Sequence, residues 1–419
     1  ARRPAGNPLD TGQYFAPPMA PAEAARLTVP FEEVEERLRQ TLKQHGAAIV
    51  TGVVPSAEEL KALEEEFASD LHDLVDTQAL SSAPEAVRQA HESYLAGGPR
   101  AFPARTAETW LTASAGFGLH RCICHGRFAW RVRRHPRVRA VFQALYPEAR
   151  HLVSSMDVTF FSPEGQPPAE GNKFSAHVDQ NAHDVRAGLA GCDIFQGVLY
   201  VWPSGEDGRC STTALWPGSH KSVWPEMMLD QAFRRSGANG FHYSEIRAMD
   251  DRERALALAD GWAQNARRAV VPAGGMLLWS SRTVHAGWKG GPRLAQAVCF
   301  EPAARRSEAE RLAKLRLAAL GLASTHWAAV GMQHDMCLGS PGCLETKGTE
   351  AAEGEGDSSG ILLPLRRALR PEGLARNADL AALLALVAVQ YRHTGMWMPR
   401  AEHRALLEAS VAAEVKRYL

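Results

Sequence analysis

Apolar and polar residues follow one pattern before residue 151 of this chain and another after it. In FEEVEERLRQTLKQHG (31–46) the apolar residues recur at helical spacing up to a glycine, and AAIVTGVV (47–54) is an apolar run typical of a strand. SAEELKALEEEFASDLHDLV opens at Ser56 with a glutamate three residues later, as capped helices do. Residues 77–125 show no regular pattern, and PRVRAVFQALY (136–146) is amphipathic, which predicts a further helix.

From residue 151 onward the chain consists of short β-rich runs separated by Gly, Pro, Asn and Asp turns. The runs are HLVSSMDVTFF, KFSAHVD, FQGVLYVW, STTALW, ARRAVV, GMLLWSS and LAQAVCFEP. Helices do not alternate with most of these runs, so a sandwich or barrel is favoured over a parallel, doubly wound sheet. An insertion over roughly 221–266 is predicted to be partly helical.

The fold class expected from this order of elements is α+β, with a mainly β core and helical flanks. The predicted organisation is an extended lead (1–30), a β-rich domain with N-terminal helices (31–305), a helical extension (306–344), a flexible linker (345–360) and a C-terminal helical segment (361–419). The linker, ETKGTEAAEGEGDSSG, is acidic and rich in Gly and Ser, and it has no large apolar side chain with which to form a core.

Composition narrows the set of partners. The chain has 47 Lys and Arg residues against 47 Asp and Glu residues, so its net charge gives no reason to expect nucleic acid or an anionic membrane as a partner. No apolar run approaches the ~18 residues that a membrane-spanning helix needs. Seven scattered cysteines indicate reduced thiols and an intracellular, most simply cytoplasmic, location. Because the chain starts with Ala rather than Met, an organelle or the nucleus stays open as an alternative location.

The stretch SAHVDQNAH (175–183) places an imidazole, His177, and a carboxylate, Asp179, two residues apart on a predicted strand. Side chains at positions i and i+2 share one face of a strand, so both groups would enter the interior, where each needs a partner. The partner is either an ordinary hydrogen-bond network or a shared metal ion.

A second imidazole, His285, lies on the β-rich run GGMLLWSSRTVHAGWKGGPR, beyond a Gly-Gly turn. Two His and one carboxylate can hold Fe(II) on one face and leave positions open for a cosubstrate and oxygen. Arg293 begins the next run, where its guanidinium could form a bidentate pair with a carboxylate of a 2-oxo acid. His177, Asp179 and His285 are therefore candidate iron ligands, and Arg293 is a candidate anchor for 2-oxoglutarate.

Longer stretches around these residues resemble the phytanoyl-CoA dioxygenase family of Fe(II)- and 2-oxoglutarate-dependent oxygenases. The matching stretches are HVDQN (177–181), GVLYVWPSGEDGRCSTTALWPGSHKS (197–222) and GGMLLWSSRTVHAG (274–287). The resemblance extends over roughly 31–305 and is strongest over 151–301.

This resemblance implies a double-stranded β-helix, a jelly-roll-like antiparallel barrel related to cupins. It implies that His177, Asp179 and His285 are catalytic iron ligands and that Arg293 binds 2-oxoglutarate. The implied cofactors are Fe(II), 2-oxoglutarate and O₂, with ascorbate as a candidate stimulant. The implied reaction is hydroxylation of a C–H bond in a small molecule or acyl chain, with release of succinate and CO₂.

The chain departs from the family pattern at Val178 and Gly287, so the remaining contacts to 2-oxoglutarate are not carried over. Gln196, Tyr200 and Ser281 are the candidates for these contacts. Asn181 and His183 flank the metal pair, and ASTHW (323–327) is loosely similar to a motif in longer relatives. Candidate substrate contacts are Asn181, His183 and His326.

Several alternatives remain open. The same chemistry could act on a modified nucleobase, which would require the arginines of 127–139 to form a basic rim beside the iron. The chain could also be a catalytically silent β-helix that serves as a binding or scaffold protein. HRCICHG (120–126) has the ligand types of a zinc site, but no second ligand pair follows at a suitable spacing.

Overall fold

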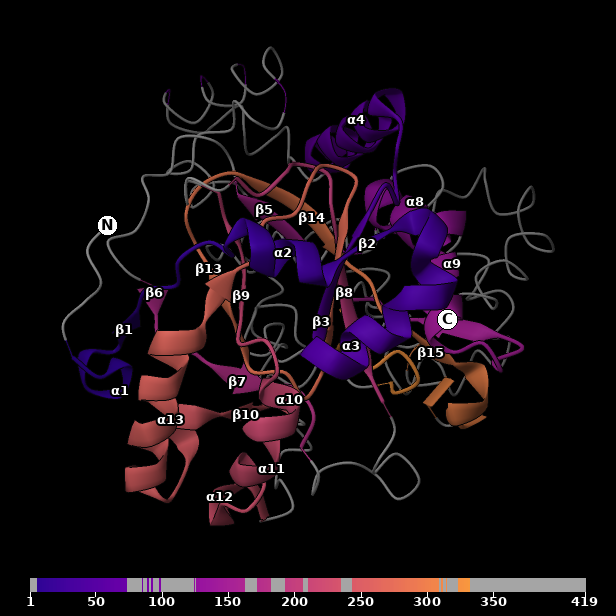
Figure 1. Ribbon diagram of the computed structural model, residues 1–419. Coiled ribbons are helices and arrows are strands. Elements are labelled where there is room, and N and C mark those ends of the chain that lie inside the picture. The colour runs from indigo at the N-terminus through magenta and orange to yellow at the C-terminus, as the bar shows by residue number, and fades with distance from the viewer. Residues whose placement is uncertain are drawn as a thin grey trace, which may run out of the picture. The chain divides into compact units, whose positions relative to one another are not determined.

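Figure 1 shows the computed structural model of the chain. The described ranges are 6–73, 126–162, 172–181, 193–205, 210–234, 243–308 and 323–331, with single positions at 85, 89, 92, 98, 124, 310, 311 and 314. The chain forms two compact units, each built from two separate stretches of sequence. Unit 1 comprises Ala1–Ser56 and Gly165–Ala295, and unit 2 comprises Ala57–Glu164 and Gln296–Leu419.

Unit 1 begins with short elements where an extended lead is expected. These are α1 (Pro8–Thr11), β1 (Gln13–Tyr14), α2 (Pro21–Leu27) and β2 (Thr28–Pro30). Both short helices have proline in their first turn, where the missing N–H costs nothing. The prolines of this segment therefore begin helices, whereas the sequence analysis took the segment to be extended.

A continuous helical stretch and a strand follow, as the sequence predicts for 31–54. They are the 3₁₀ turn η1 (Phe31–Glu33), the π-helical turn η2 (Val34–Leu38), α3 (Arg39–His45) and β3 (Ala47–Thr51). Gly46 ends α3 with a φ of 73°, and a Cβ there would lie 2.4 Å from His220 Nδ1 and 2.6 Å from Thr283 Oγ1. Glycine at this position therefore permits both the left-handed turn and the close approach of the chain that leads into β13.

Two sheets make up most of unit 1 (Figure 1). The first has the strand order β10-β7-β13-β9-β11, and the second includes β2-β3-β12-β8-β14. Their bounds are β7 (His177–Val178), β8 (Phe195–Tyr200), β9 (Thr212–Leu215), β10 (Ser244–Glu245), β11 (Arg267–Arg268), β12 (Met276–Ser280), β13 (His285–Trp288) and β14 (Arg293–Ala297), which starts in unit 1. A separate pair joins β1 to β6 (Asn172–Lys173). The β-rich runs of the sequence are confirmed as strands.

The insertion after β9 is partly helical, as predicted. It contains α10 (Ser219–Ser222), α11 (Trp224–Met227), α12 (Gln231–Arg234), the 3₁₀ turn η4 (Ile246–Ala248) and α13 (Arg252–Asn265). These helices bury Met227 and Trp262 in one apolar cluster with Val178 of β7 and Ala286 of β13. The cluster fixes the first sheet on its helical side, which steadies the strands that carry both candidate imidazoles.

Unit 2 contains helices and short strands. They are α4 (Ala57–Asp73), α8 (Arg127–Arg134), α9 (Pro136–Leu145), β4 (Leu152–Ser154), β5 (Thr159–Ser162), β15 (Phe300–Pro302) and the 3₁₀ turn η5 (Ala303–Arg305). β4 pairs with β15 in antiparallel fashion. The rings of Phe67 and Phe128 join α4 to α8 with their centres 5.5 Å apart.

The chain is thus a mixed α/β protein with several sheets and several helices, in keeping with the predicted fold class at that level. Over the described ranges the sheets do not close into a complete barrel. None of the helices in the described part of the chain is both long and apolar enough to span a membrane.

Candidate metal centre

The register of the first sheet brings the two candidate imidazoles together. His285 on β13 lies directly opposite His177 on β7. Directly opposed residues in an antiparallel pair have Cβ atoms about 4.5–5.5 Å apart, close enough for their side chains to touch. The ring centres of His177 and His285 are 4.2 Å apart.

Asp179 completes the group from a position just beyond the strand. The sequence predicts Asp179 on the same strand as His177, but β7 ends at Val178 and Asp179 lies in a bend. The reason is that its N–H donates to the Ser281 carbonyl at 2.9 Å instead of continuing the ladder of β7. Asp179 Oδ2 nevertheless lies 3.0 Å from His285 Nε2 and 3.8 Å from His177 Nε2.

The donor atoms of these three residues all lie within 4.8 Å of one another. Over the ranges that the structure describes, no other cluster of three or more His, Cys, Asp or Glu side chains has this spacing. The side chains are 15%, 11% and 7% exposed for His177, Asp179 and His285. The group is therefore mostly shielded from solvent, with His177 the most open of the three.

Each imidazole is oriented by a backbone carbonyl two residues earlier. His177 Nδ1 lies 2.5 Å from the Ser175 oxygen, and His285 Nδ1 lies 3.0 Å from the Thr283 oxygen. A carbonyl only accepts, so each Nδ1 carries a proton and donates, and Nε2 is the ring nitrogen that faces the group. Histidines that bind metal ordinarily donate their other ring nitrogen in this way.

Two Nε2 atoms and one carboxylate oxygen thus converge on a small buried volume. With both Nε2 atoms unprotonated, all three atoms would be electron-pair donors, which repel one another unless a cation lies between them. Burial and the neighbouring His285 lower the pKa of His177, although Asp179 acts in the opposite direction. Protonation of His177 is therefore disfavoured as the source of that cation, and the donor set fits a divalent metal.

Gln196 of β8 contacts the carboxylate of the group rather than standing apart from it. Its Nε2 donates to Asp179 Oδ2 at 2.8 Å, and its side chain is buried. Ser281 is fully buried and accepts the N–H of Asp179 through its backbone oxygen. No described residue forms a hydrogen bond with the Ser281 hydroxyl.

Arg293 and Tyr200 form a second polar group in unit 1. Arg293 is buried at the start of β14, and its Nη2 donates to the Tyr200 hydroxyl at 3.0 Å and lies 3.5 Å from Thr213 Oγ1. The Tyr200 hydroxyl also lies 3.0 Å from Thr212 Oγ1. Burial lowers the pKa of Arg293 from its ordinary value, because a charged guanidinium is costly to keep away from water. An anionic ligand would offset that cost.

Sequence reasoning missed the side chains of β10 and of the residue before it that lie beside His177. Glu245 is directly opposite His177 in register, and the Tyr243 ring centre is 4.5 Å from that of His177. The Tyr243 hydroxyl and the Arg247 Nε both donate to the Glu245 carboxylate. Tyr243 is nonetheless 38% exposed. These residues lie in an insertion that was predicted to be only partly helical, and the strand within it covers just Ser244 and Glu245.

The remaining candidates are placed as follows. Asn181 is buried and donates to Ser244 Oγ at 3.0 Å. His183 lies outside the described residues. His326 belongs to unit 2, where it is buried, and its predicted contact with substrate stays a prediction.

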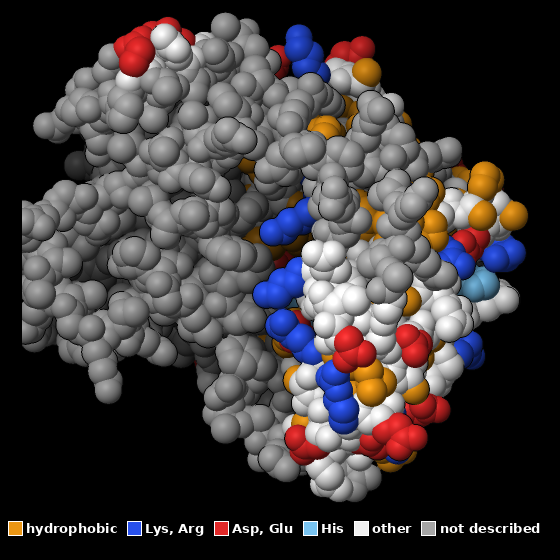
Figure 2. Space-filling view, turned by 90° about the vertical axis from the view of Figure 1, so that its left-hand side faces the viewer, with side chains coloured by type: hydrophobic (Ala, Val, Ile, Leu, Met, Phe, Trp, Pro, Cys, Tyr) orange, Lys and Arg blue, Asp and Glu red, His pale blue; other side chains and the backbone are white. Residues whose placement is uncertain are grey.

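At least one of the arginines proposed as a nucleic-acid rim is buried and hydrogen-bonded within unit 2. Arg133 is fully buried in unit 2, where it donates to the Cys124 carbonyl at 2.6 Å and the Asp157 carbonyl at 2.9 Å. The described part of the face in Figure 2 carries both Lys or Arg and Asp or Glu side chains, so neither sign covers it alone. The zinc alternative falls on 120–126, of which only Cys124 and Gly126 are described.

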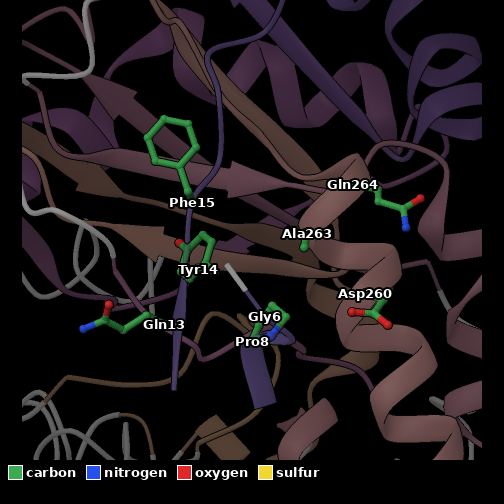
Figure 3. A pocket seen from close by; sticks show the side chains of 8 residues that line it. All are labelled: Gly6, Pro8, Gln13, Tyr14, Phe15, Asp260, Ala263 and Gln264. Carbon is green, nitrogen blue, oxygen red and sulfur yellow. The ribbon is translucent and has the colours of Figure 1, made fainter. Parts of the chain in front are cut away.

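A separate pocket of about 200 Å³ lies between the N-terminal segment and α13 (Figure 3). Its lining residues are Gly6, Pro8, Gln13, Tyr14, Phe15, Asp260, Ala263 and Gln264. None of the three candidate metal ligands lines this pocket.

Comparisons with known proteins give distant similarities only. No protein-family model matches the chain, and no curated protein matches it in sequence. Among solved structures, the epimerase SnoN in complex with Fe³⁺, alpha ketoglutarate and nogalamycin RO is 16% identical, covers 65% of this chain and 85% of its own, and has a TM-score of 0.36. EctD from S. alaskensis, with 2-oxoglutarate and 5-hydroxyectoine, is 14% identical over 74% of this chain and 85% of its own, with a TM-score of 0.34.

GIG2 (DUF1479) from Candida albicans is 10% identical, covers 85% of this chain and 88% of its own, and has a TM-score of 0.38. TM-scores of 0.34 to 0.38 establish neither a common fold nor a common activity. The chemistry of the site therefore has to be judged from its own residues.

Proposed function

We propose that this chain is a non-haem Fe(II)- and 2-oxoglutarate-dependent oxygenase that hydroxylates a C–H bond of an organic substrate. The observation that carries the proposal is the convergence of His177 Nε2, His285 Nε2 and Asp179 Oδ2, with both Nδ1 atoms committed to backbone carbonyls. Two imidazoles and one carboxylate are the ligand set of non-haem Fe(II) oxygenases.

The residues divide into two groups with separate tasks. His177, His285 and Asp179 would hold iron, and Arg293 would bind a carboxylate of 2-oxoglutarate while the Tyr200 hydroxyl keeps its guanidinium in place. When bound, iron and 2-oxoglutarate activate O₂, with release of succinate and CO₂, and supply the oxidant that attacks the substrate.

The proposed fold is the double-stranded β-helix of the phytanoyl-CoA dioxygenase family. Side chains from the two sheets of unit 1 meet, which supports this arrangement: Tyr200 of β8 contacts Thr212 of β9, and Arg293 of β14 lies beside Thr213. In such a fold the ligands lie between the two sheets, where solvent is restricted and electrostatic interactions are strong.

The proposed substrate is a small molecule or an acyl chain. Tyr243 supports a substrate face beside His177, because its ring is exposed while its hydroxyl is fixed by the buried Glu245. An aromatic ring held in this way offers apolar contact area at little entropic cost.

Anaerobic titration with Fe(II) in the presence of 2-oxoglutarate tests the proposal. A protein that binds both should develop a metal-to-ligand charge-transfer band in the visible spectrum. We expect the band in the wild-type protein and its loss in His177→Ala, with far-UV circular dichroism unchanged. A wild-type protein without the band, or a variant that keeps it at full intensity, would refute the assignment. A silent binding protein would give the first of these results.

A further inference from the structure

Gln196, which is outside the three candidate ligands, donates a hydrogen bond to the converging oxygen. Its Nε2 lies 2.8 Å from Asp179 Oδ2, the same atom that lies 3.0 Å from His285 Nε2. Gln196 is 7% exposed, so little water is available to replace its hydrogen bond. The contact is therefore buried and directed at the ligand atom itself.

Asp179 needs such a contact because its strand does not orient it. β7 ends one residue earlier, and the backbone of Asp179 is held by Ser281, whose own N–H donates to the Ile194 carbonyl at 2.8 Å. Gln196 lies opposite Trp279 in the pairing of β8 with β12, so its position is fixed by a sheet. Backbone and side chain of Asp179 are thus both held from the β8–β12 side, at two separate points.

The chemistry of an amide suits this task. A neutral N–H orients the carboxylate without adding positive charge, whereas Lys or Arg at the same place would repel a divalent cation. We infer that Gln196 is a positioning residue that holds Asp179 Oδ2 toward the two imidazoles and thereby sets the affinity of the site for a divalent metal. The inference rests on the proposed metal centre, and the contact of Gln196 with 2-oxoglutarate stays a separate prediction.

The test uses Mn²⁺ alone, as a redox-stable substitute for Fe(II), with binding measured by isothermal titration calorimetry on the full chain. Gln196→Met keeps nearly the same shape and removes the donor. We expect the Kd for Mn²⁺ to rise about 10–100-fold, as is typical when a residue that supports a metal ligand is lost. Gln196→Leu is the second variant, should Gln196→Met fail to fold.

Gln296→Met is the matched control. Gln296 is a fully buried glutamine of unit 2. Its side-chain amide accepts a hydrogen bond from Thr159 Oγ1 and donates one to the Ala297 carbonyl, and neither residue is a candidate ligand. This variant should lower the unfolding temperature and leave the Kd for Mn²⁺ at the wild-type value. A merely structural role for Gln196 would move the unfolding temperature in the same way without moving the Kd.

The outcomes separate the two proposals. A Gln196→Met protein whose Kd stays within about twofold of the wild type overturns the positioning role and leaves the metal centre standing. A wild-type protein that binds no Mn²⁺ overturns both. An equal loss of affinity in Gln296→Met, or failure of both Gln196 variants to fold, would show that Gln196 acts on the fold and would also overturn the inference.

Discussion

The candidate metal centre of unit 1 and the buried cations of unit 2 are both polar groups removed from water, yet their partners differ. In unit 2, Lys314 is fully buried, and its Nζ donates to the carbonyls of Ser154 and, at 2.6 Å, Ala328. Arg133 likewise donates to two carbonyls. In unit 1, by contrast, three electron-pair donors face one another.

This difference separates a structural role from a functional one. Burial, together with the nearby Arg306, lowers the pKa of Lys314 well below its ordinary value, so desolvation alone does not identify a functional group. What marks the unit 1 group is that two imidazole nitrogens and a carboxylate oxygen, all atoms that bind metal ions, lie within 4.8 Å of one another. Donors matched with acceptors hold a fold together, and converging acceptors indicate a ligand.

The largest effect should come from removing the carboxylate of the metal centre. In Asp179→Ala, succinate release should fall by more than about 100-fold, beyond the loss expected when only a supporting residue is removed. The variant should keep its fold, as far-UV circular dichroism of the metal-free protein would show, so that the lost activity is not a loss of folding. Turnover near the wild-type rate would show that the unit 1 group, like the buried basic side chains of unit 2, has only a structural role.

The next largest effect concerns Arg293. Truncating one partner of a buried charge pair costs about 2–5 kcal/mol, so Arg293→Met should raise the KM for 2-oxoglutarate about 30-fold or more. The Kd for Mn²⁺ should not change, because the guanidinium donates to the Tyr200 hydroxyl and lies beside Thr213, neither of which is a candidate ligand. An unchanged KM would show that the guanidinium is structural, like that of Arg133.

Lys314→Met should act on stability only. The substitution leaves the carbonyls of Ser154 and Ala328 buried without their donor, which should lower the free energy of unfolding by about 2–4 kcal/mol. Urea denaturation measures this loss, and calorimetry with Mn²⁺ should give the wild-type Kd. A stable variant with weakened Mn²⁺ binding would contradict the structural role.

The smallest effect is expected from Asp230, a second buried carboxylate of unit 1 that can be compared with Asp179. The N–H groups of Ala232, Asp250 and Asp251 donate to this buried carboxylate, whereas Asp179 Oδ2 accepts from the Gln196 amide and also faces two imidazoles. Burial acts to raise its pKa, but these three hydrogen bonds together hold the pKa below its ordinary value of 3.8. The carboxylate therefore stabilises the fold above pH 3.8, and this contribution is lost as the pH falls through the lower folded-state pKa.

Asp230→Asn should accordingly lower the free energy of unfolding by about 1–2 kcal/mol at pH 7. The difference from the wild type should narrow in acid, below pH 3.8, as urea denaturation at several pH values would show. A difference that stays constant over the whole range would contradict the role given to the carboxylate.

Local pattern was sufficient for much of the fold. Each β-rich run of the sequence contains a strand, and the helices at 31–45, 57–73 and 136–145 are where their apolar spacing and capping place them. These elements depend on neighbours a few residues away, which a sequence displays directly. The spacing of His177, Asp179 and His285 likewise identified a group that the structure brings together.

Long-range contacts were not readable in the same way. The bond from Asp179 N–H to Ser281, which takes Asp179 off its strand, joins segments about a hundred residues apart in the chain. Tyr243 comes beside His177 only through the pairing of β10 with β7. Arg133 lies in the Arg-rich run that the nucleobase alternative requires beside the iron, yet it donates to the carbonyls of Cys124 and Asp157. Register and partner choice are set by packing, which a local pattern does not contain.

The most direct test of the metal centre is a crystal structure grown with Mn²⁺ and examined by anomalous diffraction at the Mn absorption edge. We expect one strong peak bonded to His177 Nε2, His285 Nε2 and Asp179 Oδ2, at distances of about 2.0–2.3 Å. A map with no peak at saturating Mn²⁺, or with its strong peak on other side chains, would contradict the claim that these three residues form a metal site.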